Sequence, residues 1–379
     1  MFGGEVRNVE LQFVPEMLDD IYDKFGEGVR VRTVGDKHKV SVPVQVSPTF
    51  FDRADDRGNH TDGSSVPSPR NYRLTDENFE YSTGAKTRFR QNIEAIKLMK
   101  RLRQEGRPAT EEEKKVLAKY VGWGGLANAF DVTKEEWQKE FTELRELLDA
   151  DEYRLARESV LSAHYTPKKV IDGMFEGLKR LGFERGKVLE PALGIGNFIG
   201  LLPETFDRKE TYGVEVDYIT GNIAKLLYPE TKVKVCGFEQ TNFAKNSFDA
   251  VITNVPFGSF KVNDAEYNRF GFFIHNYFLA KSIDRVRPGG IVAVITTKGT
   301  MDKANPDVRQ YIANRANLLG AIRLPNTIVI SVICNSIITF RLRSSNISNN
   351  TSSIITTFDY AVVFIVIQTI FIRHIDITR

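Results

Sequence analysis

Residues 163–326 alternate short apolar runs with amphipathic segments, and this alternation most limits what the chain can fold into. Segments of helical periodicity fit between the apolar runs, and the turns that join them are short. Parallel strands need a crossover between them, usually a helix, so the alternation predicts an α/β fold with a doubly wound, mostly parallel sheet. The predicted strands are residues 187–190, 211–216, 233–237, 248–253, 291–296 and 318–324.

The rest of the chain divides by composition and periodicity. Residues 51–70 are rich in Gly, Ser, Pro and Asp, which is typical of a flexible linker. Residues 327–379 contain no Gly, Pro, Lys or Glu, which indicates a frameshifted or non-native tail, although residues 336–342 could form one last strand. The predicted domains are an N-terminal segment with its linker (1–70), a helical region (71–150), the α/β domain (151–326) and the anomalous tail (327–379).

Composition places the chain among globular proteins, with 41% hydrophobic and 27% charged residues. The net charge is only +3, so any nucleic-acid surface must be local. Two distant cysteines, Cys236 and Cys334, indicate neither a disulfide framework nor a zinc cluster. We see no signal peptide and no run long enough to span a membrane, so a cytoplasmic protein is expected. No metal site is expected, because the histidines lack ligand spacing: His38, His60, His164, His275 and His374.

The first predicted strand of the α/β domain runs into a glycine loop, VLEPALGIGNFIG, with Gly194 and Gly196. Ile199 stands where a dinucleotide fingerprint has its third glycine, so the NAD signature is incomplete. Glu215 ends the next strand, where an acid can accept hydrogen bonds from ribose hydroxyls. The loop therefore favours a nucleoside ligand without a pyrophosphate, such as S-adenosylmethionine. The alternative is an ordinary strand–turn–helix with an incidental acid.

The fourth predicted strand, residues 248–253, is followed by Asn254-Val255-Pro256-Phe257. Such a motif could activate the amine of a base, for example adenine N6. This amine is a poor nucleophile because its lone pair is delocalised into the ring. The Asn254 side-chain oxygen and the Val255 carbonyl could accept its two protons, and Pro256 restricts Val255 to extended geometry. Phe257 offers a face on which an extruded base can stack. The alternative is a strand end followed by a plain turn.

These motifs resemble those of the N6-adenine-specific DNA methyltransferases, over about residues 163–326. The segments that carry the resemblance are EPALGIGNF, YGVEVD and NVPFG, with AHYTPKKVI upstream. AHYTPKKVI stands before the glycine loop, and this order of motifs resembles the gamma arrangement within the family. The segments YVGWGGLANAFD and RFRQNIEAIKLMKRL are similar to the large methylase–helicase proteins of bacterial conjugative elements and phages.

The resemblance implies a Rossmann-like methyltransferase sheet with a helical N-terminal extension, and S-adenosyl-L-methionine as cofactor. The implied catalytic residues are Asn254, Val255, Pro256 and Phe257. The implied cofactor-binding residues are Tyr165, Thr166, Glu190, Gly194, Gly196, Glu215, Phe238 and Glu239. Two positions depart from the family pattern. Val255 replaces a usual proline, and Gly237-Phe238-Glu239 replaces a usual Gly-Asp-Phe.

The resemblance also implies partners and a setting. DNA is the expected substrate, a helicase domain or protein is a candidate partner, and restriction-modification or a mobile element is the expected context. Two alternatives stay open: a methyltransferase acting on an RNA base or a protein glutamine, and an inactive fragment of a methylase–helicase, since no P-loop is present.

Two features of the helical region leave alternatives open. Trp123 could stack on nucleic acid or anchor a helix corner in the core. A run of basic residues could bind phosphates or form a solvated helix face. The run comprises Arg88, Arg90, Lys97, Lys100, Arg101, Arg103 and Arg107.

Overall fold

The computed structural model describes residues 6–13, 30–34, 37–45, 70–79, 84–160, 166–324 and 335–342. The chain divides into two compact units, Met1–Pro67 and Ser68–Arg379. In the first unit, three antiparallel strands form a sheet in the order β1-β3-β2. These strands are β1 (Val6–Phe13), β2 (Arg30–Val34) and β3 (Lys37–Gln45). Residues 51–69 of the predicted linker lie outside the described residues.

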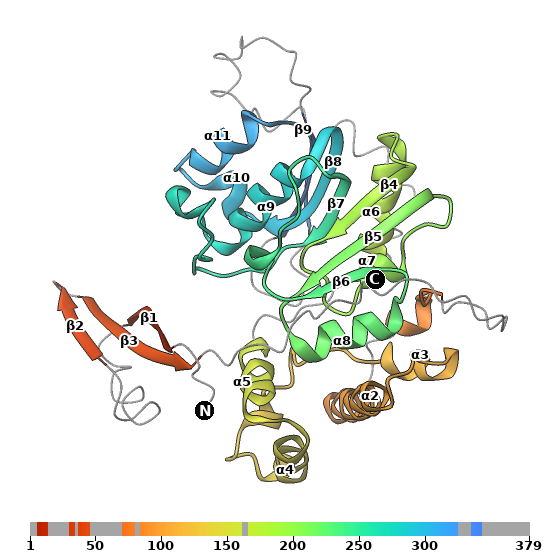
Figure 1. The fold of residues 1–379 in the computed structure, drawn as a ribbon, viewed down its shortest axis with the longest axis vertical. Helices are drawn as coiled ribbons and strands as arrows, with labels where there is room; N and C mark the ends of the chain where they lie inside the picture. Colours follow the sequence, from red (N-terminus) through yellow and green to blue (C-terminus); the bar gives the residue numbers. More distant parts are fainter. Residues whose placement is uncertain are drawn as a thin grey trace, which may run out of the picture. The chain divides into compact units, whose positions relative to one another are not determined.

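Within the described part of the second unit, seven strands form one sheet in the order β6-β5-β4-β7-β8-β10-β9 (Figure 1). Neighbouring strands from β6 to β8 are parallel, whereas β10 is antiparallel to both of its neighbours. This order confirms the doubly wound, mostly parallel sheet. The strands are β4 (Arg185–Glu190), β5 (Asp207–Glu215), β6 (Lys232–Val235), β7 (Phe248–Asn254), β8 (Val286–Thr297), β9 (Ala316–Arg323) and β10 (Asn335–Leu342).

Both faces of the sheet are buried, which is why its central strands are almost continuously apolar. Along β7, Ala250 and Ile252 join one hydrophobic cluster and Val251 joins the other. Successive side chains of a strand point to opposite faces, so this division follows the pleat. One face is covered by α6 (Lys168–Arg180) and α8 (Tyr218–Leu227); the other is covered by α9 (Ile274–Arg285) and α11 (Asp307–Ala313). Figure 1 shows the two layers on either side of the strands.

The strand β10 lies inside the stretch expected to be an anomalous tail. It pairs with β8 on one side and with β9 on the other. Ile337 belongs to one hydrophobic cluster, and Ile338 and Phe340 belong to the other. The prediction of a last strand at 336–342 is therefore confirmed. The composition that indicated a non-native tail is compatible with a strand here, because a buried strand favours β-branched and aromatic side chains over Gly, Pro or Lys. Residues 343–379 lie outside the described part.

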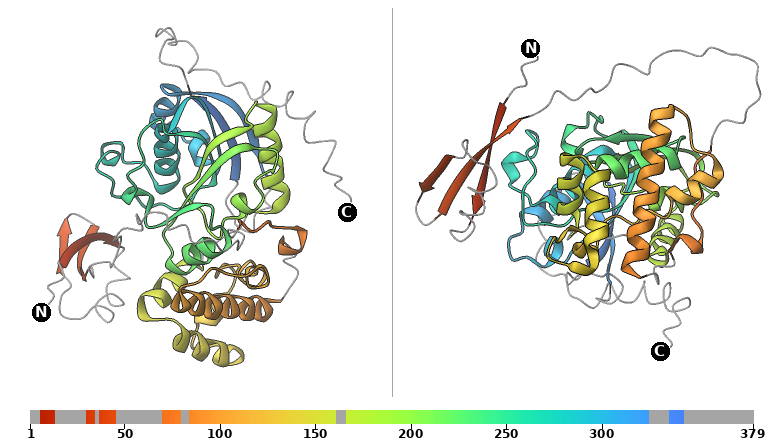
Figure 2. Two further views of the ribbon diagram at one scale, coloured as in Figure 1. Left: turned by 45° about the vertical axis from the view of Figure 1, so that its right-hand side comes forward. Right: turned by 90° about the horizontal axis from the view of Figure 1, so that it is seen from below.

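The helical region of the second unit lies beside α8, in orange to yellow in Figure 2. A capping box begins α3, because Thr110 accepts from the Glu113 N–H and the Glu113 side chain accepts from the Thr110 N–H. The main helices are α2 (Ala85–Glu105), α3 (Glu111–Leu117), α4 (Gln138–Leu147) and α5 (Ala150–Ser159). Short helices are α7 (Asn197–Gly200), α10 (Gly299–Asp302), η2 (Asp76–Phe79), η3 (Ala127–Phe130), η4 (Glu135–Trp137), η5 (Phe238–Gln240) and η6 (Asn268–Phe270).

The structure bears on both features of the helical region: Trp123 is packed in the core, and the basic run makes surface ion pairs, as a solvated helix face would. Trp123 is 2% exposed, and its ring meets that of Phe130 edge-on at 5.2 Å, so it anchors the core. Much of the basic run on α2 is engaged by neighbouring polar side chains. The contacts are Lys97 with Glu143, Lys100 with Glu152, Arg101 and Arg107 with Glu113, and Arg103 with Asn222. None of the helices in the described part of the chain is both long and apolar enough to cross a bilayer.

Candidate active site at the carboxyl edge of the sheet

Three predicted site residues occupy the same position on three neighbouring strands. Glu190 is the last residue of β4, Glu215 is the last residue of β5, and Asn254 is the last residue of β7. The strand β4 is parallel to both β5 and β7 and lies between them. The carboxyl ends of parallel strands meet at one edge, where open α/β sheets bind their ligands. We call the ends of β4, β5 and β7 the carboxyl edge.

On the β4–β5 side, the glycine loop is tied directly to Glu215. One carboxylate oxygen accepts the Gly194 N–H at 2.7 Å, and the other accepts the Asp217 N–H at 2.8 Å. Gly194 and Gly196 have φ angles of 55° and 83°, which favour glycine. A Cβ at position 196 would collide with the ring of Tyr228. The loop therefore requires glycine at position 196, and its backbone lies against the carboxylate of Glu215.

Burial makes both acids of this side reluctant to ionise. Burial raises the pKa of Glu215 to about 7, helped by the charge of Asp217 and opposed by backbone hydrogen bonds. Burial also raises the pKa of Glu190 well above its usual value, and the neighbouring Glu215 adds to this effect. The Oε2 atom of Glu190 is buried without a hydrogen-bond partner in the described part of the chain. A buried orphan acceptor of this kind calls for a ligand or a proton.

These features fit a nucleoside cofactor. A carboxylate has about four lone-pair positions, more than the backbone bonds to Glu215 occupy, so it retains acceptor capacity for a ribose hydroxyl. Gly196 cannot carry a side chain, which keeps the loop backbone open to close approach. Groups of three His, Cys, Asp or Glu side chains that could hold a metal ion are absent from the described residues.

On the β7 side, the Asn254 amide is held from one end only. Its Nδ2 donates to the Thr166 hydroxyl at 3.2 Å, whereas its Oδ1 is buried and has no partner among the described residues. A buried acceptor without a hydrogen bond costs about 1–3 kcal/mol. An unpaired acceptor in a folded protein is therefore often one to which a ligand donates. The contact with Thr166 also joins the segment upstream of α6 to the end of β7. The sequence placed Thr166 at the cofactor and gave no signal of this contact.

The backbone after Asn254 is fixed by the neighbouring strand. The Val255 N–H donates to the Ile295 carbonyl of β8 at 3.1 Å, and the Val255 side chain is 1% exposed. A proline at this position could not donate that bond. The departure from the usual two prolines thus replaces a ring constraint with a hydrogen bond to the sheet.

The loop between β7 and α9, residues 255–273, which we call the post-β7 loop, begins with two aromatic side chains near the motif. Phe257 is half-buried and packs against both hydrophobic clusters. Phe260 is 56% exposed and lies over Gly258, where a Cβ would meet its ring at 2.5 Å. The sequence analysis named Phe257 and missed Phe260. The only signal of Phe260 in the sequence was an aromatic residue three positions after Phe257.

The remaining predicted cofactor residues lie in different surroundings. The Phe238 ring is 2% exposed and packs against Phe278 at 5.2 Å, in the layer of α9. Glu239 is half-buried, and its carboxylate folds back over Gly237. A role for either residue at the cofactor adenine stays a prediction. Tyr165 and His164 lie outside the described residues.

A further contribution comes from residues at the start of the helical region, just before η2. The Leu74 N–H donates to the Gly200 carbonyl at 3.1 Å, and the Tyr72 N–H donates to the Leu227 carbonyl at 2.8 Å. A Cβ on Gly200 would collide with the Leu74 side chain. This segment therefore braces the helix that follows the glycine loop. The sequence offered no periodicity there from which to predict it.

Comparison with known proteins agrees with this geometry. The profile of the family described as N-6 DNA methylase matches residues 151–359. Over 243 residues the chain is 30% identical to the "Defense against restriction protein B" of Escherichia phage P1. That alignment spans 62% of this chain but only 9% of the phage protein.

Solved structures with a similar fold are more distant in sequence. A class I S-adenosylmethionine-dependent methyltransferase from Listeria monocytogenes is 16% identical, with a TM-score of 0.45, over 70% of this chain and 91% of that one. A TehB-like methyltransferase from Corynebacterium glutamicum is 15% identical, with a TM-score of 0.32, over 45% of this chain and 88% of that one.

Proposed function

Since this chain belongs to the N-6 DNA methylase family, whose methyl donor is S-adenosylmethionine, we propose that it methylates the N6 amine of adenine in DNA. The family match confirms the resemblance predicted from the motifs. The observation that supports the adenine reaction most is the free Oδ1 of Asn254, which ends β7 one strand away from Glu190. An acceptor of this kind is what an exocyclic amine requires.

The β4–β5 side of the carboxyl edge would hold the cofactor. Bound S-adenosylmethionine supplies an electrophilic methyl group on a sulfonium sulfur. Glu215 would accept the ribose hydroxyls, and the positive φ angles of Gly194 and Gly196 would let the loop backbone lie against the nucleoside. Glu190, buried and with one oxygen unpartnered, would accept from a donor on the cofactor. Tyr165, Thr166, Phe238 and Glu239 are further candidates for cofactor contacts.

The β7 side would hold and activate the base. Asn254 Oδ1 and the Val255 carbonyl would each accept one N6 proton, which shifts lone-pair density back onto nitrogen. The Val255 N–H bond to β8 and the fixed φ of Pro256 would aim that carbonyl. Phe257 would stack on the extruded ring, a contact worth about 1–3 kcal/mol. Aligning a nucleophile with a bound methyl group is itself a large part of such catalysis.

The substrate and partners are supported less directly. The name of the phage relative connects it with restriction, which supports DNA as the substrate and restriction-modification as the setting. This chain covers 9% of that protein, so we propose only by likeness that it works with a helicase domain or protein. The presence of β10 between β8 and β9 supports an intact sheet over an inactive fragment.

The test is a substrate panel with methyl-labelled S-adenosylmethionine. Duplex DNA, single-stranded DNA, RNA and a glutamine-containing peptide are incubated with the protein, and the products are digested and identified by mass spectrometry. We expect N6-methyladenine in DNA. Label found only in RNA or peptide would show that the same site methylates a different amine. Label in none of them would contradict the proposal.

A further inference from the structure

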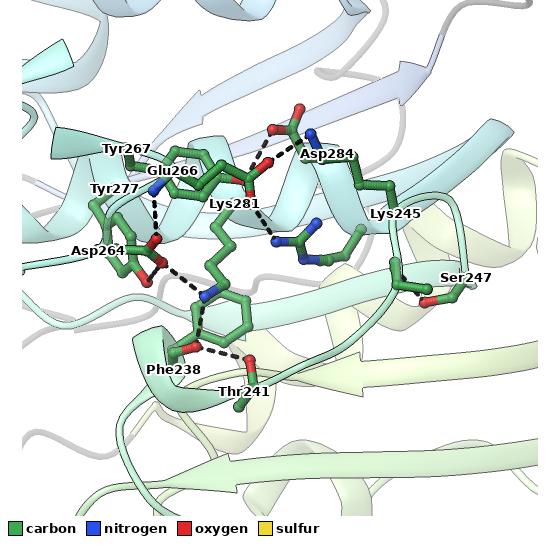
Figure 3. Close-up of polar contacts among 12 residues, drawn as sticks. Phe238, Thr241, Lys245, Ser247, Asp264, Glu266, Tyr267, Tyr277, Lys281 and Asp284 are labelled. Carbon is green, nitrogen blue, oxygen red and sulfur yellow. Dashed lines mark hydrogen bonds and ion pairs between the residues drawn. The ribbon is translucent and has the colours of Figure 1, made fainter. Parts of the chain in front are cut away.

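A buried lysine on α9 connects the two sides of the proposed site. Lys281 is 2% exposed, and its ammonium makes two strong contacts (Figure 3). It donates to the carbonyl of Phe238 at 2.7 Å and to the carboxylate of Asp264 at 2.9 Å. Phe238 begins η5, directly after β6, and Asp264 lies in the post-β7 loop. One ammonium thus joins a segment proposed for the cofactor to the loop proposed for the target base.

The loop end of this connection is reinforced by other side chains of α9. The Tyr277 hydroxyl donates to the same Asp264 oxygen at 2.8 Å. The other Asp264 oxygen accepts the backbone N–H of Glu266 at 3.0 Å, and Arg285 donates to the Glu266 carboxylate at 2.8 Å. Figure 3 shows these side chains of the loop converging on the helix. The post-β7 loop is therefore held from α9 by charged contacts.

The cofactor end of the connection is close to Glu239. The Lys281 ammonium lies 4.9 Å from the centre of the Phe238 ring. Burial lowers the pKa of Lys281, while Asp264 and Glu239 oppose that effect. Burial also works against the Asp264 charge, but hydrogen bonds from Lys281 and Tyr277 outweigh it, so the pKa of Asp264 is lowered. The charged form of Asp264 is therefore favoured, beside a lysine whose own charge is disfavoured by burial.

Energetic considerations argue against stability as the main use of this pair. A buried ion pair is often no more stabilising than apolar side chains of the same volume, because both charges must be desolvated. Its geometry is specific, however, since each partner is left unsatisfied when the other moves. A pair that bridges two segments of one site therefore makes the position of one segment depend on the other.

We propose that Lys281 is a positioning residue that couples cofactor binding at the segment of Phe238 and Glu239 to the ordering of the post-β7 loop. This inference rests on the cofactor half of the proposed function and does not depend on which amine accepts the methyl group. A cofactor bound against residues 237–241 would fix the position of the Phe238 carbonyl, and so the position of the Lys281 ammonium. Lys281 would in turn hold Asp264, and with it the loop that carries Pro256 and Phe257.

Trypsin can report the state of this loop without any catalysis. Lys261 and Arg269 are both exposed and lie on either side of Asp264. Site couplings of this kind are typically 5- to 150-fold, so saturating S-adenosylmethionine is expected to slow cleavage at both positions by about fivefold or more in the unaltered chain. Cleavage rates are measured by mass spectrometry, and cofactor affinity is measured by calorimetry on the same samples.

Three variants separate coupling from folding. Lys281→Met removes both contacts and is expected to bind cofactor without slowing the cleavage. Asp264→Asn removes the charge and one acceptor oxygen at the loop end only. It is expected to keep the cofactor affinity of the unaltered chain and to lose most of the protection. It decides the question if Lys281→Met does not fold. Tyr277→Phe is the matched control, because it removes one bond to Asp264 and leaves both Lys281 contacts, so protection persists.

The outcomes distinguish this inference from the proposed function. If the unaltered chain binds S-adenosylmethionine but gains no protection, or if Asp264→Asn is protected as well as the unaltered chain, the coupling is overturned and the cofactor site stands. If the unaltered chain binds no S-adenosylmethionine, the cofactor site and the coupling are overturned together.

Discussion

The two sides of the carboxyl edge are held by different kinds of interaction. On the β4–β5 side, backbone N–H groups of Gly194 and Asp217 bind one carboxylate, and glycine φ angles shape the loop. On the β7 side, buried side-chain charges such as Lys281 and Asp264 hold the loop against α9. The proposed cofactor has the same nucleoside in every turnover, so a fixed backbone cradle suits it. The proposed target base lies in a variable polymer, which suits a loop held by a few specific contacts.

The largest expected effect is on the acceptor of the β7 side. Asn254→Ala removes the unpartnered Oδ1, and loss of one such polar group in a transition state costs about 10²–10³ in rate. Cofactor affinity is expected to stay unchanged, because the Glu215 contacts are untouched. Single-turnover methyl transfer and calorimetry measure the two quantities. Asn254→Asp, which keeps an acceptor oxygen, is expected to lose less. Equal losses in both variants would show that the acceptor is not what matters.

The next effect breaks the β4–β5 side. Gly196→Ala places a Cβ against the Tyr228 ring at a φ of 83°. Left-handed backbone and overpacking together are expected to lower the free energy of unfolding by about 2–4 kcal/mol and to weaken cofactor binding. Gly177→Ala is the control, since nothing lies within 4 Å of its Cβ position, and α6 should gain up to about 1 kcal/mol. Urea melts compare the two. A neutral Gly196→Ala would contradict the account of the loop.

A smaller effect sharpens the comparison at the point where the two sides meet. Thr166 accepts from Asn254 Nδ2 and so leaves Oδ1 as the free atom of the amide. Thr166→Val removes that acceptor, and loss of an orienting contact typically costs about 10–100-fold in activity. Thr166→Ser keeps the hydroxyl and should restore most of the rate. Both variants are compared by the rate of the chemical step and by cofactor affinity. A Ser variant as slow as Val would point to shape instead of orientation.

The smallest effect is a pH dependence specific to the β4–β5 side. The pKa of Glu215 is raised from 4.5 to about 7, so the folded state holds a proton that the unfolded chain has lost between these values. The free energy of unfolding of the cofactor-free protein therefore falls as pH rises through this window, by about 1–2 kcal/mol for a half-buried carboxyl. Glu190 is also buried with a raised pKa and adds its own fall over this range, so Glu215→Gln should flatten only the part that Glu215 contributes. Urea melts from pH 4.5 to 8 measure it, and an unchanged slope in the variant would contradict it.

Much of the fold was predictable from the sequence. Apolar residues that repeat about every 2 positions in strands and about every 3.6 positions in helices indicate which faces are buried. Each predicted strand of the α/β domain lies within or overlaps an observed one, from β4 to β9. The ends of β4, β5 and β7 could be located for the same reason. Composition alone did not separate a non-native tail from β10, since absence of Gly, Pro and Lys is also compatible with a buried strand.

The contacts that hold the site were beyond the sequence. Thr166 meets Asn254 across 88 residues, and Lys281 meets the Phe238 carbonyl across 43. Such pairs depend on how whole layers pack, and no local pattern encodes them. Lys281 was hidden for a further reason: a lysine in an amphipathic helix usually lies at the surface.

The most direct test of the account is an experimental structure of the protein with bound S-adenosylmethionine. The account predicts the ribose hydroxyls on Glu215 and the sulfonium methyl facing Asn254 Oδ1 across the ends of β4 and β7. A cofactor bound elsewhere, or a methyl group turned away from Asn254, would contradict the claim that one edge of the sheet serves both the donor and the acceptor.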